Sequence, residues 1–544
     1  MDGLMMQSQL TIYSLIEHAA RFHGDTEIVS RTVEGPIHRY TYAKAFQRVH
    51  RLANVLRNLG VGDGDRVATL AWNGYRHLEL YFAISSMRAV CHTINPRLFA
   101  DQIAYIMEHA TDKIVFVDLT FVPILEAIAE KLSSVNSVVI LTDGKHMPDT
   151  SLPNALCYED LMAAAADRFD WPEIDENTAS SLCYSSGTTG SPKGVLYSHR
   201  SSVLHSLAIC ASDALAISAT DSILPVVPMF HVNAWGIPYA AAMAGAKLVL
   251  PGAGMDGASV WELMDAERVT FAAGVPTIWM MLIQYLKENG KSLPYLERTI
   301  IGGAALPQSM IETFENDYDV TSIHAWGMTE TSPVGTVCRL KGKMRELPPD
   351  EKLSYKIKQG RPVYGVDMKI IDDNDQSLPH DGVAFGELCV KGPWIAADYF
   401  EHTETDNQAV TEDGWFRTGD VSTIDSEGFM HIVDRSKDII KSGGEWISSI
   451  ELENIALGHD AVAEAAAIGV AHPKWGERPL LICVLNEGAA ISGAELLKIY
   501  DGRLPNWSWP DAVEFVDELP HTATGKIQKL KLRETYSDYI IRTD

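Results

Sequence analysis

The sequence is short of positive charge. Its 544 residues contain 45 Lys and Arg against 72 Asp and Glu, which gives a formal net charge of −27. Nucleic acids and anionic membranes are bound by basic surfaces, so this charge argues against both as general partners. It does not exclude a local basic pocket that holds a small anion.

Cysteine pairs and long apolar runs are also lacking. The seven cysteines are widely spaced, with no Cys-x-x-Cys pair, so we expect no disulfide framework or thiolate zinc site, and a reducing, cytoplasmic location. The N-terminus lacks a basic region followed by a long apolar one, so no secretory signal is expected. The most apolar stretch, 235–255, contains Lys247 and two prolines. It predicts a buried helix, turn and strand rather than an integral membrane span.

Two common catalytic motifs are missing. No Gly-x-Ser-x-Gly occurs, so a hydrolase with a nucleophile elbow is set aside, and no His-Glu-x-x-His zinc motif occurs.

Short apolar runs alternate with helical patterns through about the first 430 residues. Buried strands are predicted at 66–71, 113–117, 137–141, 247–250 and 298–301. Helices are predicted at 42–59, 78–89, 100–110 and 260–265. This alternation predicts parallel sheets with helices on both faces.

The pattern changes after about residue 360. Dense glycines and short strands at 367–371, 386–390 and 429–433 predict a small β-rich unit. From about residue 437 we predict a separate α+β domain. Its helices are expected at 448–457 and 493–502, and its strands at 462–470, 480–485 and 512–516. The predicted domains are therefore 1–436 and 437–544, joined by a short hinge.

The segment 184–195, with the sequence YSSGTTGSPKGV, carries the clearest chemical signal. Its glycines allow a tight turn, and its hydroxyls, backbone N–H groups and Lys193 can surround a phosphate. It is not a Walker A loop, because it contains no Gly-Lys-Ser or Gly-Lys-Thr.

This loop resembles the phosphate loop of the adenylate-forming superfamily of acyl-CoA synthetases, peptide-synthetase adenylation domains and beetle luciferases. Further motifs follow in the family's order along nearly the whole chain. They are 228–231 (PMFH), 302–304 (GGA), 325–330 (AWGMTE), 415–420 (WFRTGD), 434–438 (DRSKD), 441–445 (KSGGE) and 520–526 (PHTATGK).

The resemblance implies a fold and a reaction. The fold would be α/β: a large domain of stacked mixed sheets with helices and a β-rich subdomain, and a small mobile α+β C-terminal domain. The reaction would be ATP-dependent acyl-CoA ligation with ATP, Mg²⁺ and CoA. A carboxylic acid and ATP would give acyl-AMP and pyrophosphate, and the CoA thiol would then displace AMP. Both steps gather negative charge, so positioned donors and cations should carry the catalysis.

The resemblance also assigns the phosphate contacts. Thr188, Thr189 and Lys193 would hold the β- and γ-phosphates. Thr329 would bind the α-phosphate, and Glu330, with Thr188, would hold Mg²⁺. The remaining loop residues in the cofactor site are Ser185, Ser186, Gly187 and Gly190.

On the nucleoside side, Trp326 would stack on adenine, where the family more often has tyrosine. Asp420 would accept both ribose hydroxyls, and Arg435 would bond the ribose from the far side. The backbone around adenine would come from Gly302, Gly303, Ala304, Ala325 and Gly327.

Three residues are assigned to the progress of the reaction. Lys526 would bridge the carboxylate and the α-phosphate in the first step, and Lys437 would be the hinge of a domain rotation. His231 would gate the passage for pantetheine, which the segment 475–477 would also approach. That passage would be lined by Ser442, Gly443, Gly444, Glu445 and Trp446.

The acyl pocket is expected beside Trp235, which would block a deep channel and favour a short or medium-chain acid. The segment 230–235 contains no acid to pair with an ammonium group, which disfavours amino acids. Within the family, the AWGMTE motif resembles the corresponding motif of bacterial medium-chain ligases and of ligases of the thioether acid 3-methylmercaptopropionate. We expect the latter acid first and a medium-chain fatty acid as the alternative. The other pocket residues are Gly236, Gly302, Gly327, Met328 and Pro333.

Two other functions stay open. A free-standing adenylating enzyme could load a separate carrier protein; a fused carrier domain is not expected, because the chain ends 18 residues beyond Lys526. An inactive adenylate-binding sensor would be expected to lack Lys193, Glu330 or Lys526. The resemblance further implies a homodimer through the large domain.

Overall fold

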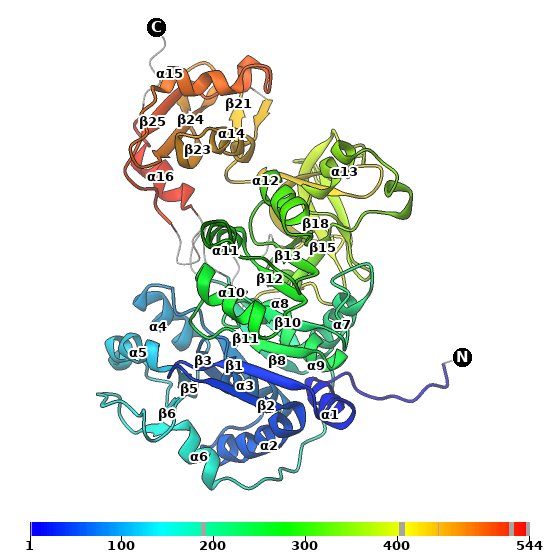
Figure 1. The fold of residues 1–544 in the computed structure, drawn as a ribbon, viewed down its shortest axis with the longest axis vertical. Helices are drawn as coiled ribbons and strands as arrows, with labels where there is room; N and C mark the ends of the chain where they lie inside the picture. Colours follow the sequence, from blue (N-terminus) through cyan, green and yellow to red (C-terminus); the bar gives the residue numbers. More distant parts are fainter. Residues whose placement is uncertain (2, 186–191, 402–408, 444, 522–526, 540–544) are drawn as a thin grey trace. The chain divides into compact units, whose positions relative to one another are not determined.

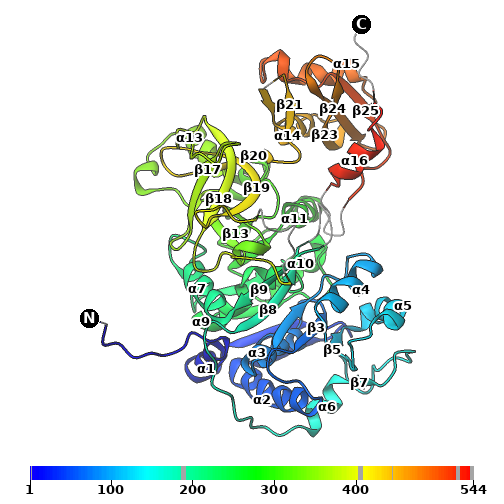
Figure 2. The ribbon, with the colours of Figure 1, turned by 180° about the vertical axis from the view of Figure 1, so that it is seen from behind.

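The computed structural model describes the chain except for residues 2, 186–191, 402–408, 444, 522–526 and 540–544. Its contacts divide the chain into two compact units. Unit 1 consists of Met1–Ser185, Lys193–Asp367 and Val390–Phe416, and unit 2 of Ser186–Pro192, Met368–Cys389 and Arg417–Asp544. Figures 1 and 2 show the ribbon from opposite sides.

A nine-stranded mixed sheet forms one half of the framework of unit 1, in the order β16-β15-β14-β13-β12-β10-β11-β1-β2. The strands are β1 (Glu27–Arg31), β2 (Ile37–Thr41), β10 (Ser222–Pro225), β11 (Lys247–Leu250), β12 (Phe271–Gly274), β13 (Arg298–Ile301), β14 (Thr321–Gly327), β15 (Val334–Val337) and β16 (Arg361–Pro362). The central strands pair in parallel, and β2, β15 and β16 pair antiparallel with their neighbours. Because β13 and β14 are parallel, their carboxyl ends lie at one edge.

A seven-stranded sheet forms the other half, in the order β7-β6-β5-β3-β4-β8-β9. Its strands are β3 (Arg66–Leu70), β4 (Val90–Thr93), β5 (Ile114–Val117), β6 (Ser137–Ile140), β7 (Ala155–Cys157), β8 (Ala179–Tyr184) and β9 (Gly194–Ser198). All neighbours pair in parallel except β8 and β9, which form an antiparallel hairpin.

Helix α3 (Tyr75–Ser86) lies between these two sheets. It contacts β1 of the nine-stranded sheet and β4 and β8 of the seven-stranded one, and all of its residues are buried. Its charged side chains are paired, as burial demands. Arg76 bonds Glu34 at 2.8 Å, and Glu79 accepts from Arg48 at 2.7 Å.

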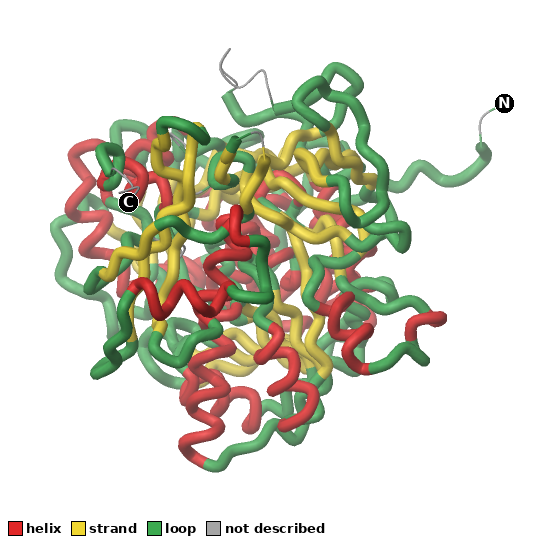
Figure 3. Tube along the Cα trace, turned by 90° about the horizontal axis from the view of Figure 1, so that it is seen from above, coloured by secondary structure: helices red, strands yellow, loops and turns green. Residues whose placement is uncertain are grey.

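Helices also cover the outer faces of both sheets. On the nine-stranded sheet, α10 (Gly257–Ala266), α11 (Pro276–Asn289) and α12 (Gln308–Glu312) enclose a core that contains the fully buried Trp279. On the seven-stranded sheet lie α4 (Ala100–His109) and α5 (Val122–Ile128). Figure 3 shows strands running between helices. The other helices are α1 (Ile12–Phe22), α2 (Tyr42–Asn58), α6 (Tyr158–Ala164), α7 (His199–Cys210), α8 (Val232–Trp235), α9 (Ile237–Ala244) and α13 (Pro349–Lys356).

Unit 2 contains two smaller sheets. One has the order β17-β18-β19-β20, with β17 (Asp367–Ile371), β18 (Phe385–Lys391), β19 (Phe416–Ile424) and β20 (Met430–Arg435). The other is formed by β21 (Ile440–Ser442), β22 (Glu445–Ile447), β23 (Val462–His472), β24 (Gly476–Leu485) and β25 (Ala512–Phe515). Its helices are α14 (Ser449–Leu457), α15 (Gly493–Leu496) and α16 (Lys529–Thr535).

The predicted strands and helices of unit 1 are present, with boundary shifts of a few residues. The stretch 235–255 is a buried helix α9, a turn at Gly245 and strand β11, as predicted. No described helix has the length and apolar character that crossing a bilayer would need. The helix predicted at 493–502 ends early, because a 3₁₀ turn at Leu497–Tyr500 follows α15 and places the Tyr500 hydroxyl 2.8 Å from the Leu452 carbonyl.

Candidate active site

The base of the predicted phosphate loop is a closed hairpin end. Strands β8 and β9 pair Tyr184 with Gly194. Beyond this pair, the Ser185 N–H donates to the Lys193 carbonyl at 2.8 Å, and the Lys193 N–H donates to Ser185 Oγ at 3.3 Å. Five other residues predicted for the phosphate loop lie outside the described residues; they are Ser186, Gly187, Thr188, Thr189 and Gly190.

Tyr399 connects Lys193 with Glu330. Glu330 is only 5% exposed, and its Oε1 accepts the Tyr399 hydroxyl at 2.8 Å. The Lys193 ammonium lies 4.7 Å from the centroid of the same ring, a cation–π distance. The Ala396 N–H donates to the Glu330 carbonyl at 2.8 Å. Two predicted site residues distant in sequence are thus held around one phenol.

Tyr197 makes the second connection between the phosphate-loop hairpin and this region. Its hydroxyl donates to the Thr329 carbonyl at 2.6 Å from strand β9. Burial raises the pKa of Tyr197 well above its ordinary value, so the phenol stays a donor. Thr329 and Glu330 are therefore fixed from β9 on one side and from the segment around Tyr399 on the other.

Glycines allow the predicted nucleoside and acyl segments to meet. A Cβ at Gly302 would lie 2.8 Å from the Ala325 carbonyl oxygen and 3.2 Å from the Trp235 ring. A Cβ at Gly327 would lie 1.9 Å from the Pro333 carbonyl oxygen. These distances exclude a larger residue at 327 and crowd one at 302. Five residues predicted for the site are thereby in close contact.

Trp326 itself is mostly buried, with 7% of its surface exposed. Its ring lies against Gly335, where a Cβ would be 2.4 Å from Cζ3. Gly303 follows β13 with a left-handed φ of 79°, and Ala304 is exposed. Met328 is half-buried, and its N–H donates to Thr331 Oγ1 at 2.9 Å.

The acyl-pocket segment has an unusual backbone. Val232, Asn233, Ala234, Trp235 and Gly236 all have positive φ, between 46° and 72°. The left-handed helical conformation costs a non-glycine residue about 1–2 kcal/mol, and such residues rarely follow one another in it. His231 precedes this turn in extended conformation, and its carbonyl accepts the Ala234 N–H at 3.2 Å. The turn is strained, so tertiary contacts must hold it.

The C-terminal end of the left-handed turn lies on His205. A Cβ at Gly236 would lie 2.7 Å from His205 Nδ1. Burial lowers the pKa of His205 to about 3, so its ring is neutral and Nε2 can accept the Val334 N–H at 3.2 Å. His205 thereby connects α7, the turn and the strand that follows Pro333.

Within unit 2, Asp420 and Arg435 face each other on neighbouring strands. Their pair, Nε to Oδ1, measures 3.2 Å, and Asp420 is buried. Lys437 lies exposed in the turn 436–438 between β20 and β21. Arg533 bonds Asp438 at 2.7 Å beside it.

The described residues predicted for the pantetheine passage lie on or beside the paired strands β21 and β22 of unit 2. Gly443 has φ of 61°, and a Cβ there would lie 2.7 Å from the Trp475 ring. Ser442 Oγ accepts from Arg478 at 3.1 Å, and the Trp446 ring lies 5.3 Å from that of Phe385. Glu445 pairs with Ser442 across the hairpin. Gly444 and the predicted catalytic Lys526 lie outside the described residues.

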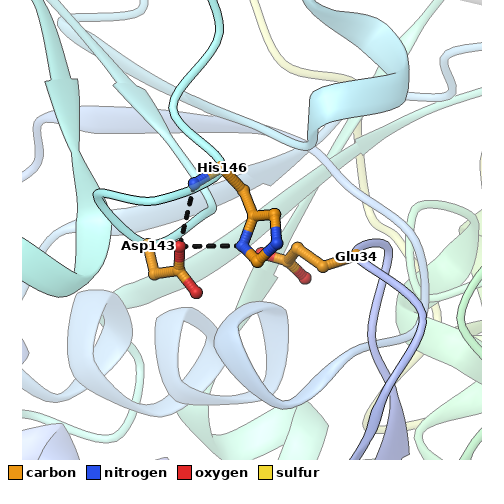
Figure 4. A group of neighbouring side chains, drawn as sticks. All are labelled: Glu34, Asp143 and His146. Carbon is orange, nitrogen blue, oxygen red and sulfur yellow. Dashed lines mark hydrogen bonds and ion pairs between the residues drawn. The ribbon is translucent and has the colours of Figure 1, made fainter.

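A cluster of potential metal ligands lies elsewhere in unit 1. Figure 4 shows Glu34, Asp143 and His146, whose ligand atoms lie within 4.8 Å of one another. Asp143 Oδ1 is bonded by both the backbone N–H and Nδ1 of His146, and Glu34 Oε1 by Arg76 and Thr142. These bonds orient Asp143, His146 and one oxygen of Glu34, whereas Glu34 Oε2 is buried without a hydrogen-bond partner among the described residues.

Sequence reasoning missed the residues that join the motifs. They are Tyr197, Tyr399, His205 and Asn233, and none is marked by a local pattern; the Asn233 amide donates to Ser181 Oγ at 3.0 Å. The only available signal was that Asn233 tolerates positive φ better than most residues.

Comparisons with known proteins agree with the resemblance. A model of the AMP-binding enzyme family matches residues 15–400, and a model of the AMP-binding enzyme C-terminal domain matches residues 451–526. The 3-methylmercaptopropionyl-CoA ligase of Ruegeria lacuscaerulensis is 52% identical over 538 residues, 99% of each chain. The medium-chain-fatty-acid–CoA ligase of Ectopseudomonas oleovorans is 50% identical over 543 residues, 100% of this chain and 99% of the other.

A solved structure shows the same fold. ATP-bound MatB from Rhodopseudomonas palustris superposes with a TM-score of 0.82 at 28% identity, covering 98% of this chain and 99% of that one. This match confirms the predicted α/β adenylating-enzyme fold.

Proposed function

The chain belongs to the AMP-binding enzyme family and is an acyl-CoA ligase, and we propose that it activates a short or medium-chain acid, first of all 3-methylmercaptopropionate. In the first half-reaction, a carboxylate oxygen attacks the α-phosphorus of ATP, and the bond to the pyrophosphate oxygen breaks. In the second, the CoA thiol attacks the acyl carbon, loses its proton, and AMP leaves.

The arrangement of Lys193, Tyr399 and Glu330 beside Thr329 carries this proposal. It places an ammonium group, a hydroxyl and a buried carboxylate at the base of the glycine-rich loop. Lys193 would hold the β- and γ-phosphates and Thr329 the α-phosphate, as charge-assisted donors. Thr188, Thr189 and Lys526 would complete the phosphate contacts.

The residues present suit Mg²⁺ and the nucleotide. Glu330 is buried and offers the hard carboxylate oxygens that Mg²⁺ favours, and Thr188 would join it. When bound, Mg²⁺ would offset charge on the phosphate oxygens. The crowding at Gly302 and Gly327 keeps side chains out of the segments proposed to face adenine. Asp420 and Arg435 would bind the ribose.

We also propose that two domains, 1–436 and 437–544, change orientation between the half-reactions about Lys437. The exposed turn 436–438, between two strands, supports a hinge there. The first orientation would bring Lys526 to the carboxylate and α-phosphate. The second would bring the hairpin around Gly443 to the pantetheine arm, with His231 gating its entry.

The choice of acid rests on the turn around Trp235. The segment 230–235 supplies no carboxylate for an ammonium group, and the Trp235 ring lies against Gly302. A ring there would shorten the pocket. The thioether acid is roughly isosteric with a five-carbon fatty acid, so both should fit, and the names of the two relatives support both. An apolar pocket discriminates by only about 1–3 kcal/mol per methylene.

A cytoplasmic location and a homodimer complete the proposal. All seven cysteines are unpaired, which suits a reducing compartment. Size-exclusion chromatography with light scattering would test the dimer.

A panel of acids tests the proposal. Purified protein with ATP, Mg²⁺ and CoA should release pyrophosphate and form a CoA thioester only when an acid is added, fastest with 3-methylthiopropionate or pentanoate. Glu330→Gln should abolish most of this activity, whereas the matched control Glu346→Gln changes an exposed glutamate and should not. Pyrophosphate release without any CoA thioester would point to a carrier protein as acceptor, and no pyrophosphate release would refute the ligase function.

A further inference from the structure

The side chain of Asn233 is one of the contacts that hold the left-handed turn 232–236. Asn233 is 5% exposed, and its amide N–H donates to Ser181 Oγ at 3.0 Å. Its Oδ1 lies 3.5 Å from Cys183 Sγ. Burial raises the pKa of Cys183 to about 11, so the sulfur stays a protonated donor. Both donor and acceptor of the amide are therefore used.

The two partners lie on the strand that leads into the phosphate loop. Ser181 and Cys183 are two positions apart on β8, so their side chains point to the same face. The Cys183 sulfur also lies 3.2 Å from Thr93 Oγ1 on β4. Asn233 thus fastens the turn to the seven-stranded sheet.

The left-handed turn also determines the position of Trp235, which lies two residues after Asn233. Four consecutive non-glycine residues would leave this backbone conformation if nothing held them, because it is unfavourable for each. The Trp235 ring now lies close to Gly302, since a Cβ built at Gly302 would be 3.2 Å from it. Without the turn, Trp235 would move away from Gly302.

We infer that Asn233 is a positioning residue that sets the chain-length preference of the acyl pocket by holding the left-handed turn against Ser181 and Cys183. The inference rests on the proposed function. Asn233 acts through the backbone and Trp235 and takes no part in either half-reaction.

The test compares kcat/KM for acids from butanoate to dodecanoate in variants of the turn. Asn233→Ala removes both hydrogen bonds. Ser181→Ala removes only the acceptor, and its small change on β8 keeps the strand. Asn233→Gly removes the amide but tolerates positive φ. Asn54→Ala is the matched control, because Asn54 is also buried and its amide bonds three carbonyls in α2 and the segment 166–168.

We expect Asn233→Ala to lower the ratio of kcat/KM for pentanoate over decanoate by about tenfold, the lower end of the discrimination expected of one methylene. Ser181→Ala should lower it less, and Asn233→Gly should keep more of it than Asn233→Ala. The KM for ATP should stay within about twofold in each variant, since rearranging the acyl pocket alone leaves the phosphate contacts in place. Asn54→Ala should lower the melting temperature and leave the ratio unchanged.

Three outcomes would overturn the inference. One is an unchanged ratio in Asn233→Ala. Another, if that variant does not fold, is an unchanged ratio in Ser181→Ala. The third is an equal change in Asn54→Ala, which would make the effect a general loss of stability. A wild-type protein that forms no acyl-CoA from any acid would instead refute the proposed function.

Discussion

The hydroxyl of Tyr399 allows the proposed role of Glu330 to be tested without disturbing Lys193. Tyr399→Phe removes only the hydrogen bond to Glu330 Oε1, which measures 2.8 Å. The ring stays, and with it the face over which Lys193 lies at 4.7 Å. Tyr399→Ala removes both contacts.

The expected sizes follow from the two contacts. A hydrogen bond to a charged group contributes about 1.5–3 kcal/mol, and the lower end applies because Tyr399 is only half-buried. Tyr399→Phe should therefore slow adenylation about tenfold, since 1.4 kcal/mol is a factor of ten. A partly exposed cation–π contact adds about 0.5–1 kcal/mol, so Tyr399→Ala should lose about a further threefold.

The assay is acid-dependent exchange of pyrophosphate into ATP over a range of Mg²⁺ concentrations. Tyr399→Phe should need more Mg²⁺ for half-maximal exchange, because the Glu330 carboxylate is less well oriented. Thioester formation from preformed acyl-AMP should be nearly unaffected. Tyr364→Phe is the matched control, because Tyr364 is 98% exposed. Wild-type exchange in Tyr399→Phe would refute the reasoning, as would an equal loss in both half-reactions.

Four further changes test other parts of the site. Lys526→Ala should nearly abolish adenylation while thioester formation from preformed acyl-AMP largely survives; equal loss of both would contradict the two-step assignment. Lys437→Pro should slow the thioester step more than adenylation, and equal slowing would remove the hinge from this position. Trp235→Ala should extend activity to longer acids; an unchanged profile would take Trp235 out of the pocket. For His205, whose pKa burial lowers from 6.5 to about 3, the unfolded state binds the proton first as the pH falls. The free energy of unfolding should therefore fall as the pH drops below 6.5, by about 2 kcal/mol at pH 5. Denaturant titrations should show that the free energy of unfolding depends less on pH in His205→Gln than in the wild type. An unchanged pH dependence would count against a neutral buried ring.

The sequence motifs indicated several residues that lie close together in the structure, but they did not indicate the side chains that connect these residues. Gly302 and Gly327 could be placed from the resemblance, and the structure gives the physical reason, since neither position has space for an ordinary side chain. The contacts that fix Glu330 and Thr329 were beyond prediction. They come from tyrosines 69 and 132 positions away in the chain. Only the folded chain shows that these phenols arrive at the same place.

The left-handed turn could not be predicted from the sequence for a different reason. Propensity alone would place Val232 and Trp235 in extended or right-handed conformations, because a Cβ crowds the following carbonyl when φ is positive. Local backbone preference therefore disfavours the observed conformation of four consecutive residues. Tertiary contacts of Asn233 and His205 hold the turn in this conformation. Such disagreement tends to occur where a chain needs a particular side chain in a particular place. Here it occurs at Trp235, whose ring lies against Gly302, the glycine proposed to border both the nucleotide and the acid. The strained backbone therefore places the side chain that is proposed to shape the acyl pocket.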